Sequence, residues 1–501
     1  MKKIFTLLLV AMTAVVARAT DYIVPVTVVV NDVTSEQLGE FSIVENDGLY
    51  DVSLKNFILD SENGPMGVGN VELKGIQPYQ DGKATLFVTE KEVTITDGDD
   101  PNVVYWMAGM LPPVNVLLRG KIEDEHLYMN LYIDLMETMD QIIQVTVGEG
   151  YQMPNPGFEL WHPSDETHVE PDGWHSFETA TGALAAFGGH HLTKSKNAHS
   201  GEACARIYSS SILGIVANGT MTTGRLNADA MIATDPANNA YLDTSMPELD
   251  GAGKPFYIPL YSRPDSIAVW VRFRQGSVNP DHPYANISAV ITDGTYYQDP
   301  EDKVYTNVVA KAKNDKIATT DGEWVRVTAP FVYTENDVEP QAILVTISTN
   351  ADAGQGSDGD EVLVDDIALI YNAKVTGLKI KGQDVPGFSS DVMNYQMELD
   401  EEISEDDIEV TVEGKTAHVL KKVAIVNDYY VCSVVALSAD MSVMSQYVID
   451  VKSSSTAIRS IKTPAGQSAY YTLDGRQAKT LAPGRIYIRR QADGTVTKIL
   501  R

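Results

Sequence analysis

Cysteine is almost absent from this 501-residue sequence, which contains only Cys204 and Cys432. The two lie far apart in the chain, so a disulfide framework is excluded as the main source of stability, and two buried free thiols are expected. The folded units must therefore rest on hydrophobic cores, which domains of more than about 100 residues can form. At about 100–200 residues per domain, the length predicts three or four domains.

Basic side chains are also scarce, because 38 lysines and arginines stand against 69 aspartates and glutamates. The formal net charge of −31 argues against binding of nucleic acid, or of an anionic membrane surface, through broad electrostatic attraction. It is compatible with neutral partners such as sugars, and with cations. The simplest interpretation is that the acidity keeps a secreted protein soluble.

Long hydrophobic runs are absent after residue 20, so no transmembrane segment is predicted. The N-terminal apolar run 4–16 is too short to span a bilayer; it follows two lysines and precedes the small-x-small motif Ala17-Arg18-Ala19. This pattern predicts a secretory signal peptide over residues 1–19, and hence a protein that is secreted or held at the outer cell surface. No cysteine follows the motif, so a lipoprotein anchor is not expected.

Motifs of common catalytic sites are missing too. No Gly-x-Ser-x-Gly elbow, phosphate-binding glycine loop or His-Glu-x-x-His motif occurs. Glycoside hydrolases need two carboxylates, but acids are so numerous here that no pair stands out. Six of the nine histidines lie between residues 162 and 199, and none has the spacing of a zinc motif. We therefore expect them to be surface histidines in loops.

Strand-like patterning is what the sequence does contain. Stretches with a helical period are rare and tyrosine is abundant, with 24 residues, so the fold class is predicted to be all-β. Residues 20–150 hold about eight runs of 5–10 residues with partial alternation, separated by hairpin signals such as Asn46-Asp47-Gly48 and Asp81-Gly82. We expect a closed up-and-down barrel here, because closure removes the unpaired edge strands.

The runs GLYDVSLKNFIL, VGNVELKGI, LPPVNVLLRGKI, LYMNLYIDL and IIQVTVG occur in this order in residues 21–150. Their order resembles the calycin-like domain of secreted Bacteroidetes proteins, which implies a lipocalin-type β-barrel. Barrels of eight strands can hold one small ligand. They are also commonly filled by their own side chains, so an apolar ligand in the barrel stays an alternative.

A domain boundary is predicted at YQMPNPGFELWH, residues 151–162. Pro154 and Pro156 end the preceding strand ladder, since proline cannot donate to it, and Phe158-Glu159-Leu160-Trp161 then alternates like a new strand. The strongly alternating segment EVLVDDIALIYNA, residues 361–373, is predicted to be the last strand of the same unit. In a jelly-roll sandwich the first and last strands lie side by side.

The central region carries further landmarks in order: NPGFELWH, PDGW, HSGEACARI, the stretch GKPFYIPLYSRPDSIAVWVRFRQG, then GEWVRVTAPFVY and VLVDDIALIY. With these, residues 151–372 resemble the putative carbohydrate metabolism (PCMD) domain of Bacteroidetes. The resemblance implies a jelly-roll β-sandwich with a carbohydrate-related role, and no demonstrated reaction.

Two smaller β units are predicted at the C-terminal end. Residues 373–453 hold six strand-like runs in about 80 residues, which suits an immunoglobulin-like β-sandwich. Residues 454–501 contain YTLDGR, a Pro-Gly turn and IYIRR, and resemble the C-terminal sorting domain of type IX secretion substrates, with Arg485 where a branched residue is commoner. This resemblance implies that the β tail is an address read by the secretion machinery.

Oxygen-bearing side chains gather at the two ends of the central region. If the first and last segments lie together, a site for Ca²⁺ is predicted, because Ca²⁺ takes six to eight oxygen ligands. Similar jelly-roll carbohydrate-binding domains place a structural calcium at this junction. The alternative is that Glu159 faces outward and the aspartates cap a sheet edge. The candidate ligands are Asn155, Glu159, Asp365 and Asp366.

Sugar recognition needs exposed aromatic faces beside polar side chains. Trp161 and Trp270 lie inside alternating strands and are expected to pack in the core, whereas Trp174 follows a Pro-Asp-Gly turn and is expected to be exposed. The candidate ligand-binding residues are Trp174, His175, Tyr296 and Tyr297.

The sequence thus predicts a secreted, multidomain all-β protein that binds a polysaccharide or other glycan without catalysis, through its central jelly roll. Two alternatives stay open. A glycoside hydrolase would require two facing carboxylates in a cleft, at least one with a raised pKa. A structural or adhesive surface protein would show convex polar surfaces.

Overall fold

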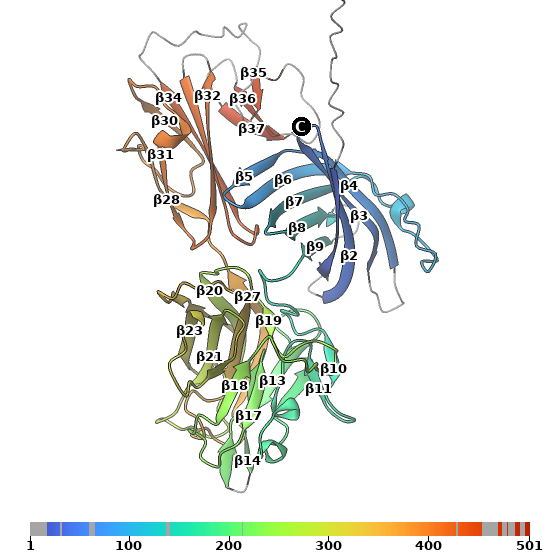
Figure 1. Ribbon diagram of the computed structural model, residues 1–501, viewed down its shortest axis with the longest axis vertical. Helices are drawn as coiled ribbons and strands as arrows, with labels where there is room; N and C mark the ends of the chain where they lie inside the picture. Colours follow the sequence, from blue (N-terminus) through green and yellow to red (C-terminus); the bar gives the residue numbers. More distant parts are fainter. Residues whose placement is uncertain are drawn as a thin grey trace, which may run out of the picture.

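The computed structural model describes residues 18–30, 33–59, 66–136, 141–212, 214–426, 429–452, 469–472, 478, 486–490 and 496–500. In these residues the protein is all-β, as predicted (Figure 1), and its other regular elements are the short 3₁₀ helices η1 Ala108–Met110, η2 Phe177–Thr179, η3 Ala185–Phe187 and η4 Glu405–Asp407. None of the helices in this part is long and apolar enough to cross a membrane.

Two sequence predictions lie wholly or mainly outside the described residues. They are the signal peptide over 1–19, of which only Arg18 and Ala19 are described, and the turns of the C-terminal tail. The prediction of free thiols is confirmed, since Cys204 and Cys432 are unpaired and buried. Burial raises the pKa of each thiol to about 12.

The N-terminal unit is one antiparallel sheet of nine strands in the order β4-β3-β2-β1-β9-β8-β7-β6-β5. Strands that follow one another in the chain are neighbours in the sheet, except β4 and β5, which are its two edges, and β1 pairs with both β2 and β9. The strands are β1 Arg18–Val30, β2 Val33–Asn46, β3 Leu49–Leu59, β4 Met66–Ile76, β5 Pro78–Asp81, β6 Ala84–Val93, β7 Val114–Glu123, β8 His126–Asp134 and β9 Ile142–Val147.

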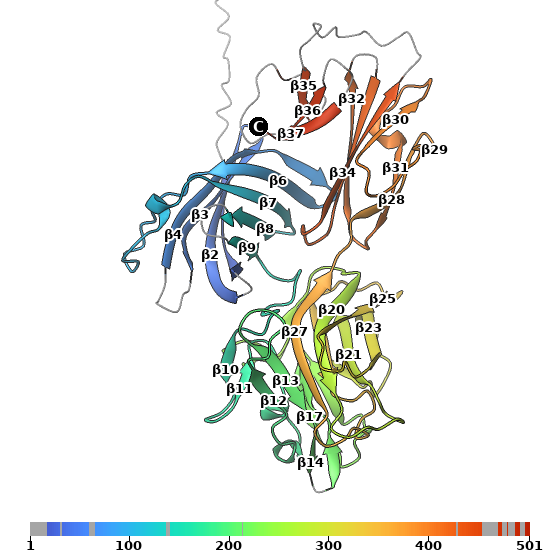
Figure 2. The same ribbon diagram turned by 180° about the vertical axis from the view of Figure 1, so that it is seen from behind.

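This sheet is strongly curled (Figure 2), which brings β4 near β6 and the segment after it. Two isolated bridges join β4 to the segment after β6: Gly67 pairs with Trp106, and Asn70 and Thr96 exchange two backbone hydrogen bonds of 2.7 and 3.2 Å. Gly69 permits this approach, because a Cβ there would lie 2.2 Å from the Thr96 carbonyl oxygen. The inner face is packed with side chains such as Phe41 and Phe87, so apolar residues fill the interior where a ligand was considered.

The central unit is a sandwich of a five-stranded and a six-stranded sheet. In the first sheet the order is β12-β13-β27-β20-β24, and in the second it is β16-β26-β21-β23-β25, with β19 beside β26. The strands are β12 Leu192–Ser195, β13 Cys204–Tyr208, β16 Thr220–Thr222, β19 Ile258–Pro259, β20 Ser266–Arg274, β21 Ala285–Thr292, β23 Val308–Ile317, β24 Val325–Pro330, β25 Val332–Tyr333, β26 Ala342–Ser348 and β27 Glu361–Ile370.

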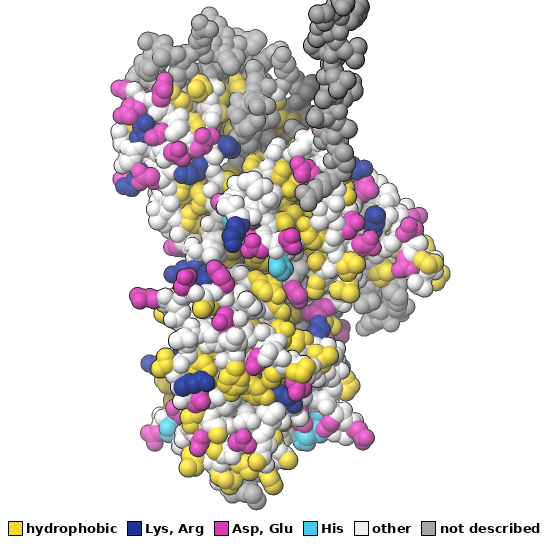
Figure 3. Space-filling model, in the orientation of Figure 1, with side chains coloured by type: hydrophobic (Ala, Val, Ile, Leu, Met, Phe, Trp, Pro, Cys, Tyr) yellow, Lys and Arg dark blue, Asp and Glu magenta, His cyan; other side chains and the backbone are white. Residues whose placement is uncertain are grey.

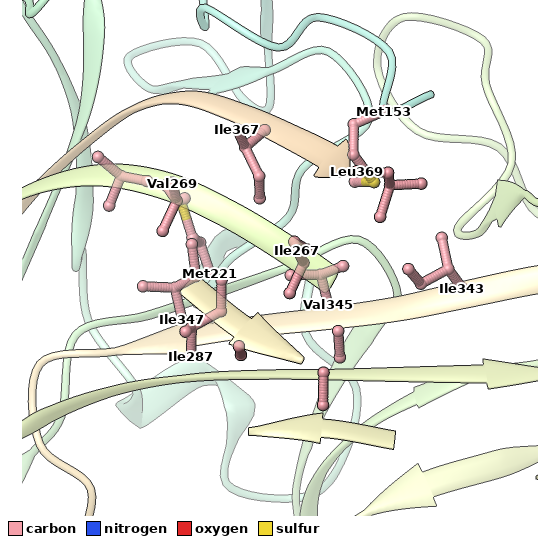
Figure 4. Packing of buried hydrophobic residues seen from close by; sticks show 14 of the residues in the cluster. Met153, Met221, Ile267, Val269, Ile287, Ile343, Val345, Ile347, Ile367 and Leu369 are labelled. Carbon is pink, nitrogen blue, oxygen red and sulfur yellow. The ribbon is translucent and has the colours of Figure 1, made fainter. Parts of the chain in front are cut away.

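Alternation along β20 explains the core between these sheets. Ile267, Val269, Val271 and Phe273 point inward and are buried, and the residues between them point outward. Figure 4 shows Ile267 and Val269 on one layer facing side chains of β26 on the other. Smaller sheets flank the sandwich: β10 Trp161–Pro163 with β11 Val169–Pro171, β14 Ser210–Ile212 with β15 Ile215–Ala217, and β17 Arg225–Ala228 with β18 Asn238–Leu242 and β22 Tyr297–Asp299.

The third unit also consists of two sheets around its own core. One has the order β29-β28-β31 and the other β30-β34-β33-β32, in which β30 runs parallel to β34. The strands are β28 Lys374–Ile380, β29 Gln383–Asp384, β30 Asn394–Glu398, β31 Ile408–Glu413, β32 His418–Val426, β33 Tyr429–Leu437 and β34 Met444–Lys452.

The C-terminal strands β35 Ala469–Thr472, β36 Ile486–Arg490 and β37 Val496–Leu500 form a three-stranded antiparallel sheet. It packs on the third unit, because Tyr471 and Ile488 share a buried cluster with Val426 and Val448. Arg490 is buried there and donates from Nη1 to the carbonyl oxygen of Val426 at 2.7 Å. The acidic side chains, in contrast, are spread over the visible face of all the units rather than concentrated in one block (Figure 3).

The three larger units meet at Asp440, in the turn between β33 and β34. Its carboxylate accepts hydrogen bonds from Ser438 Oγ and Ser442 Oγ, both at 2.7 Å, and from Gln152 Nε2 at 2.9 Å, while its carbonyl oxygen accepts from Asn130 Nδ2 at 2.6 Å. Asp440 is only 1% exposed. One residue therefore holds the N-terminal, central and third units in a common arrangement.

We predict that Asp440→Ala lowers the free energy of unfolding by about 1–3 kcal/mol, because it leaves buried donors without an acceptor. The variant should also become sensitive to proteolysis between the units. Urea unfolding and limited proteolysis measure both effects. Asp440→Asn keeps one acceptor oxygen in the side chain, so its free energy of unfolding should fall by less. An equal fall in the two variants would contradict the role of the Asp440 carboxylate as a hydrogen-bond acceptor between the units.

Candidate functional site

The opening segment of the central unit lies beside its closing strand, as the sequence pattern predicts. Ile367 of β27 donates its backbone N–H to the carbonyl oxygen of Pro156 at 2.9 Å. The prediction that a strand begins at residue 158 is wrong, because β10 begins only at Trp161. Asn155 and Phe158 have positive φ angles of 44° and 54°, which bend the chain into turns.

A β-bulge in β27 shapes the site. Opposite β20, Ala368 pairs with Ala268 and Asp365 pairs with Trp270, so β27 has one more residue than β20 between these pairs. Asp366 occupies the bulge with a φ of +44°. Consequently Val364 and Ile367 both enter the core, and two consecutive aspartates lie between them.

The first of these aspartates, Asp365, is fully buried and anchors the loop between β12 and β13. Its Oδ2 accepts the backbone N–H groups of His199 at 2.7 Å and Ser200 at 3.3 Å, and its Oδ1 accepts that of Asp366 at 2.9 Å. Burial and the neighbouring charge of Asp366 raise the pKa of Asp365 to about 7, although the three backbone donors oppose this shift.

The other acidic candidates hold the same loop. Asp366 Oδ2 lies 2.6 Å from His199 Nδ1, and its Oδ1 accepts from Ser200 Oγ at 2.7 Å. Glu159 Oε1 accepts the backbone N–H groups of Glu202 and Ala203 at 2.9 and 3.2 Å. Burial raises the pKa of Glu159, and these two donors partly offset that effect.

The four proposed calcium ligands are brought together only in part. A Cβ added to Gly157 would lie 3.6 Å from Asp366 Oδ1 and 3.9 Å from Asp365 Oδ1, so both oxygens face the space beside this glycine. Asn155 is turned elsewhere, because its side chain bonds the backbones of Leu160 and Asp172. Within the described residues, Glu159, Asp365 and Asp366 do not place ligand atoms within 4.8 Å of one another. Calcium at this junction stays a prediction.

His199 connects this junction to an aromatic surface. Its ring stacks on Trp270 with a centroid distance of 3.9 Å and an interplanar angle of 16°, and it meets Trp324 edge-on at 5.7 Å. The Arg272 guanidinium lies 5.7 Å from the Trp324 ring centroid. All four side chains are partly exposed on the outer face of the five-stranded sheet. We call this set the His199 site.

The sequence placed Trp270 in the core, which is wrong. Core positions on β20 are odd-numbered, so Trp270 and Arg272 point to the outer face. His199 and Trp324 were missed as ligand-binding candidates, because only the fold brings their segments together. Both lie in quoted landmarks, HSGEACARI and GEWVRVTAPFVY, which was the one signal available.

The expectation that Trp174 is exposed is wrong, since its exposed fraction is 0%. Gly173, with a φ of +77°, turns the chain back so that Trp174 packs against Phe158 at 5.4 Å in the core. His175 is equally buried; it pairs with Thr222 in a bridge and lies 3.3 Å from the Asp250 carboxylate. Neither side chain is open to a ligand.

The side chains of Tyr296 and Tyr297 point in opposite directions, because successive residues of a strand face opposite sides of the sheet. Tyr297 faces inward, is 1% exposed and belongs to a buried cluster with Leu242 and Val290. Tyr296 is 39% exposed and its ring lies 5.8 Å from that of Tyr241. Of the four sugar-binding candidates, only Tyr296 is thus accessible, and no ring contact or hydrogen bond joins it to His199, Trp270 or Trp324 in the described residues.

Comparisons with known proteins give little guidance. No known protein family matches the chain, and no curated protein matches it either. A structure of the M60 catalytic domain with two CBM51 domains from Clostridium perfringens is 12% identical, with a TM-score of 0.15, over 96% of this chain and 44% of the other. A GH32 beta-fructofuranosidase from Bombyx mori is 9% identical, with a TM-score of 0.07, over 66% of this chain and 83% of the other.

The chain therefore spans less than half the length of the first structure, at 44%. Similarities this low carry no argument about function. The resemblances stated for residues 21–150, 151–372 and 469–501 rest on their sequence motifs alone.

The raised pKa of Asp365 predicts a pH effect. Between the ordinary value of 3.8 and about 7, the folded protein binds this proton more tightly than the unfolded chain, so stability falls as the pH rises through this window. Asp365→Asn should remove this contribution, worth at most about 1.4 kcal/mol per pH unit. Urea unfolding at several pH values in the presence of a chelator gives the difference between variant and wild type. If the difference in unfolding free energy between variant and wild type does not change with pH, the pKa of Asp365 is not raised.

Proposed function

We propose that the central unit binds a glycan without catalysis at the His199 site. The observation that carries the proposal is the group of partly exposed rings from Trp270, His199 and Trp324 beside the guanidinium of Arg272. Aromatic faces accept the C–H groups of sugar rings, and neighbouring polar groups reach the hydroxyls. The rings come from a strand, a loop and a strand start, and Asp365 fixes the loop, so the surface is preorganised.

The charge around this site favours an acidic sugar. Arg206, Arg272, Arg274 and Arg326 all belong to the strands of the same sheet, and Arg326 pairs directly with Trp270 across β20 and β24. Arg206 and Arg274 both contact Glu361. Among the described residues, Arg272 and Arg326 have no carboxylate within ion-pair distance. In a chain with a net charge of −31, this local excess of guanidinium groups suits a carboxylated or sulfated glycan.

The carboxylates at the site suit binding better than hydrolysis. A glycoside hydrolase needs an acid with a raised pKa that touches the substrate. Asp365 has the raised pKa, but it is fully buried and its oxygens already accept backbone N–H groups. Asp366 is held by His199 and Ser200. These carboxylates therefore support a structural role beneath the aromatic surface.

We also propose, on the sequence features alone, that the protein acts outside the cell, with residues 469–501 addressed to the secretion machinery. A glycan partner fits that location, and the negative net charge disfavours nucleic acid as a partner.

We predict that Trp270→Ala and Trp324→Ala each weaken glycan binding by about two- to tenfold, since one aromatic contact contributes about 0.5–1.5 kcal/mol beyond its buried area. Glycan arrays with neutral and acidic glycans would select the ligand, and isothermal titration would measure the affinity. Tyr296→Ala, at an exposed tyrosine away from these rings, is the matched control and should bind normally.

The salt dependence and the products decide between the alternatives. If the affinity falls as the salt concentration rises, and falls in the Arg272→Gln variant, an acidic glycan is supported. Release of shortened products would support the hydrolase instead. Absence of binding to any arrayed glycan at millimolar concentration would remove the proposal in favour of a structural or adhesive protein.

We propose that Ca²⁺, if bound, is held by Asp365 and Asp366 in the space beside Gly157, where hard oxygen ligands converge. Calcium at 100 times its Kd should then stabilise the fold by about 2.7 kcal/mol, measured as a rise in Tm. Asp366→Asn should abolish the rise. Asp358→Asn, in the acidic loop before β27, should retain it. An identical Tm with calcium and with chelator would argue that the aspartates act only as hydrogen-bond acceptors.

A further inference from the structure

A second cluster of histidines lies at the edge of the central unit, outside the His199 site. His168, Glu178 and His190 place one potential ligand atom each within 4.8 Å of the others, and no other such group of three occurs among the described residues. Figure 3 shows histidine side chains beside acidic ones at the surface in the region of β10 and β11. We propose that these three residues form a binding site for a divalent transition metal of the Zn²⁺ type.

The two imidazoles are arranged around one carboxylate. The rings of His168 and His190 are stacked, with centroids 3.4 Å apart and planes at 19°. Glu178 Oε1 is in close contact with His190 Nδ1, and its Oε2 lies 3.9 Å from His168 Nδ1. The Glu178 side chain is only 9% exposed, and its ion pairs within the described structure are made with these two histidines alone.

The charge of the cluster suits a metal dication. Glu178 lies beside both histidines, and Asp165, whose Oδ2 lies 2.7 Å from His168 Nδ1, adds a second carboxylate. A dication would balance the charge of these two acids.

The three segments are each held in place without a metal. Asp165 Oδ1 accepts the backbone N–H groups of Thr167 at 2.6 Å and His168 at 2.7 Å, which closes the turn before β11. The N–H of Glu178 is capped by Ser176 Oγ at 3.2 Å at the start of η2. His191, the neighbour of His190, is buried and its Nδ1 lies 2.7 Å from the Tyr208 carbonyl oxygen. The ligand set is therefore preorganised by the fold.

The donor set selects the metal class. Two imidazole nitrogens and a carboxylate suit Zn²⁺, which takes three protein ligands plus water or a fourth ligand, whereas Ca²⁺ and Mg²⁺ prefer oxygen alone. Asp165 is a positioning residue, because it bonds Nδ1 of His168, and a carboxylate on one ring nitrogen commonly orients a histidine whose other nitrogen binds a metal. A bound ion would connect the loop before β11, helix η2 and the loop before β12. The spacing of 168, 178 and 190 fits no short motif, so only the fold assembles the set.

The test uses the full chain without a histidine tag, stripped of metal with a chelator. Isothermal titration with ZnCl₂ should give one equivalent bound per chain together with a rise in Tm. Co²⁺ as a spectroscopic probe should show the visible bands of a low-coordinate nitrogen–oxygen site. CaCl₂ in excess should not displace either ion.

The variants separate this site from adventitious binding. His168→Ala, His190→Ala and Glu178→Gln should each weaken Zn²⁺ binding at least tenfold. His282→Ala is the matched control, because His282 makes the same kind of contact with Asp352 at 2.7 Å, but no second histidine contacts it in the described residues. Unchanged stoichiometry in His190→Ala, or no saturable Zn²⁺ binding by the wild type, would overturn the proposal. If a variant fails to fold, the Co²⁺ spectrum of the wild type still decides, since octahedral oxygen coordination would contradict it.

Discussion

The carboxylate of Asp365 is the contact on which the arrangement of the candidate site depends. It is buried in β27, where an unsatisfied carboxylate would be costly, and it accepts N–H groups from His199, Ser200 and Asp366. These bonds fix the loop between β12 and β13 against the sheet. The position of His199 on Trp270 follows from them. The aromatic surface is thus built on a loop that Asp365 holds together with Asp366 and Glu159.

The bulge in β27 is what makes two adjacent acids compatible with a core strand. In a regular strand, residues 364 and 366 would share a face, so with Val364 in the core Asp366 would be buried in apolar surroundings. The extra residue lets Val364 and Ile367 face inward together, and it turns Asp366 toward the loop and solvent. It also frees the N–H of Ile367 for Pro156, which fastens the opening segment of the unit. Bulges commonly redirect side chains next to functional sites, and this one orients both the loop and the acids.

Much of the fold could be predicted from local pattern, because alternation and turn residues act over a few positions. The all-β class and the antiparallel N-terminal sheet follow from such signals. The contact between residues 156 and 367 was instead predicted from the expected jelly-roll sandwich, whose first and last strands lie side by side. The bridges from β4 to the segment after β6, Asn70 with Thr96 and Gly67 with Trp106, could not be predicted, since isolated bridges leave no pattern in the sequence.

The candidate site was less predictable, for reasons visible in particular residues. Trp174 follows a turn that leads inward, and the sequence of a turn does not tell where the chain goes next. β20 is apolar at most positions, so its pattern did not reveal that Trp270 faces outward. Alternation required Tyr296 and Tyr297 to point apart, but the face that is buried depends on the neighbouring sheet. His199 and Trp324 meet only because distant segments fold together.

The two histidine sites show how the partners of an imidazole determine what it can bind. His199 has one carboxylate at its Nδ1 and two indole rings beside it, so its polar capacity is largely used and its surroundings are aromatic. His168 and His190 instead stack on each other and share Glu178, with Asp165 behind His168, so nitrogen and oxygen atoms converge. Aromatic neighbours favour contact with the apolar faces of a sugar, and convergent donor atoms favour an ion. The neighbours of each imidazole, rather than the residue type, therefore underlie the two different proposals for these sites.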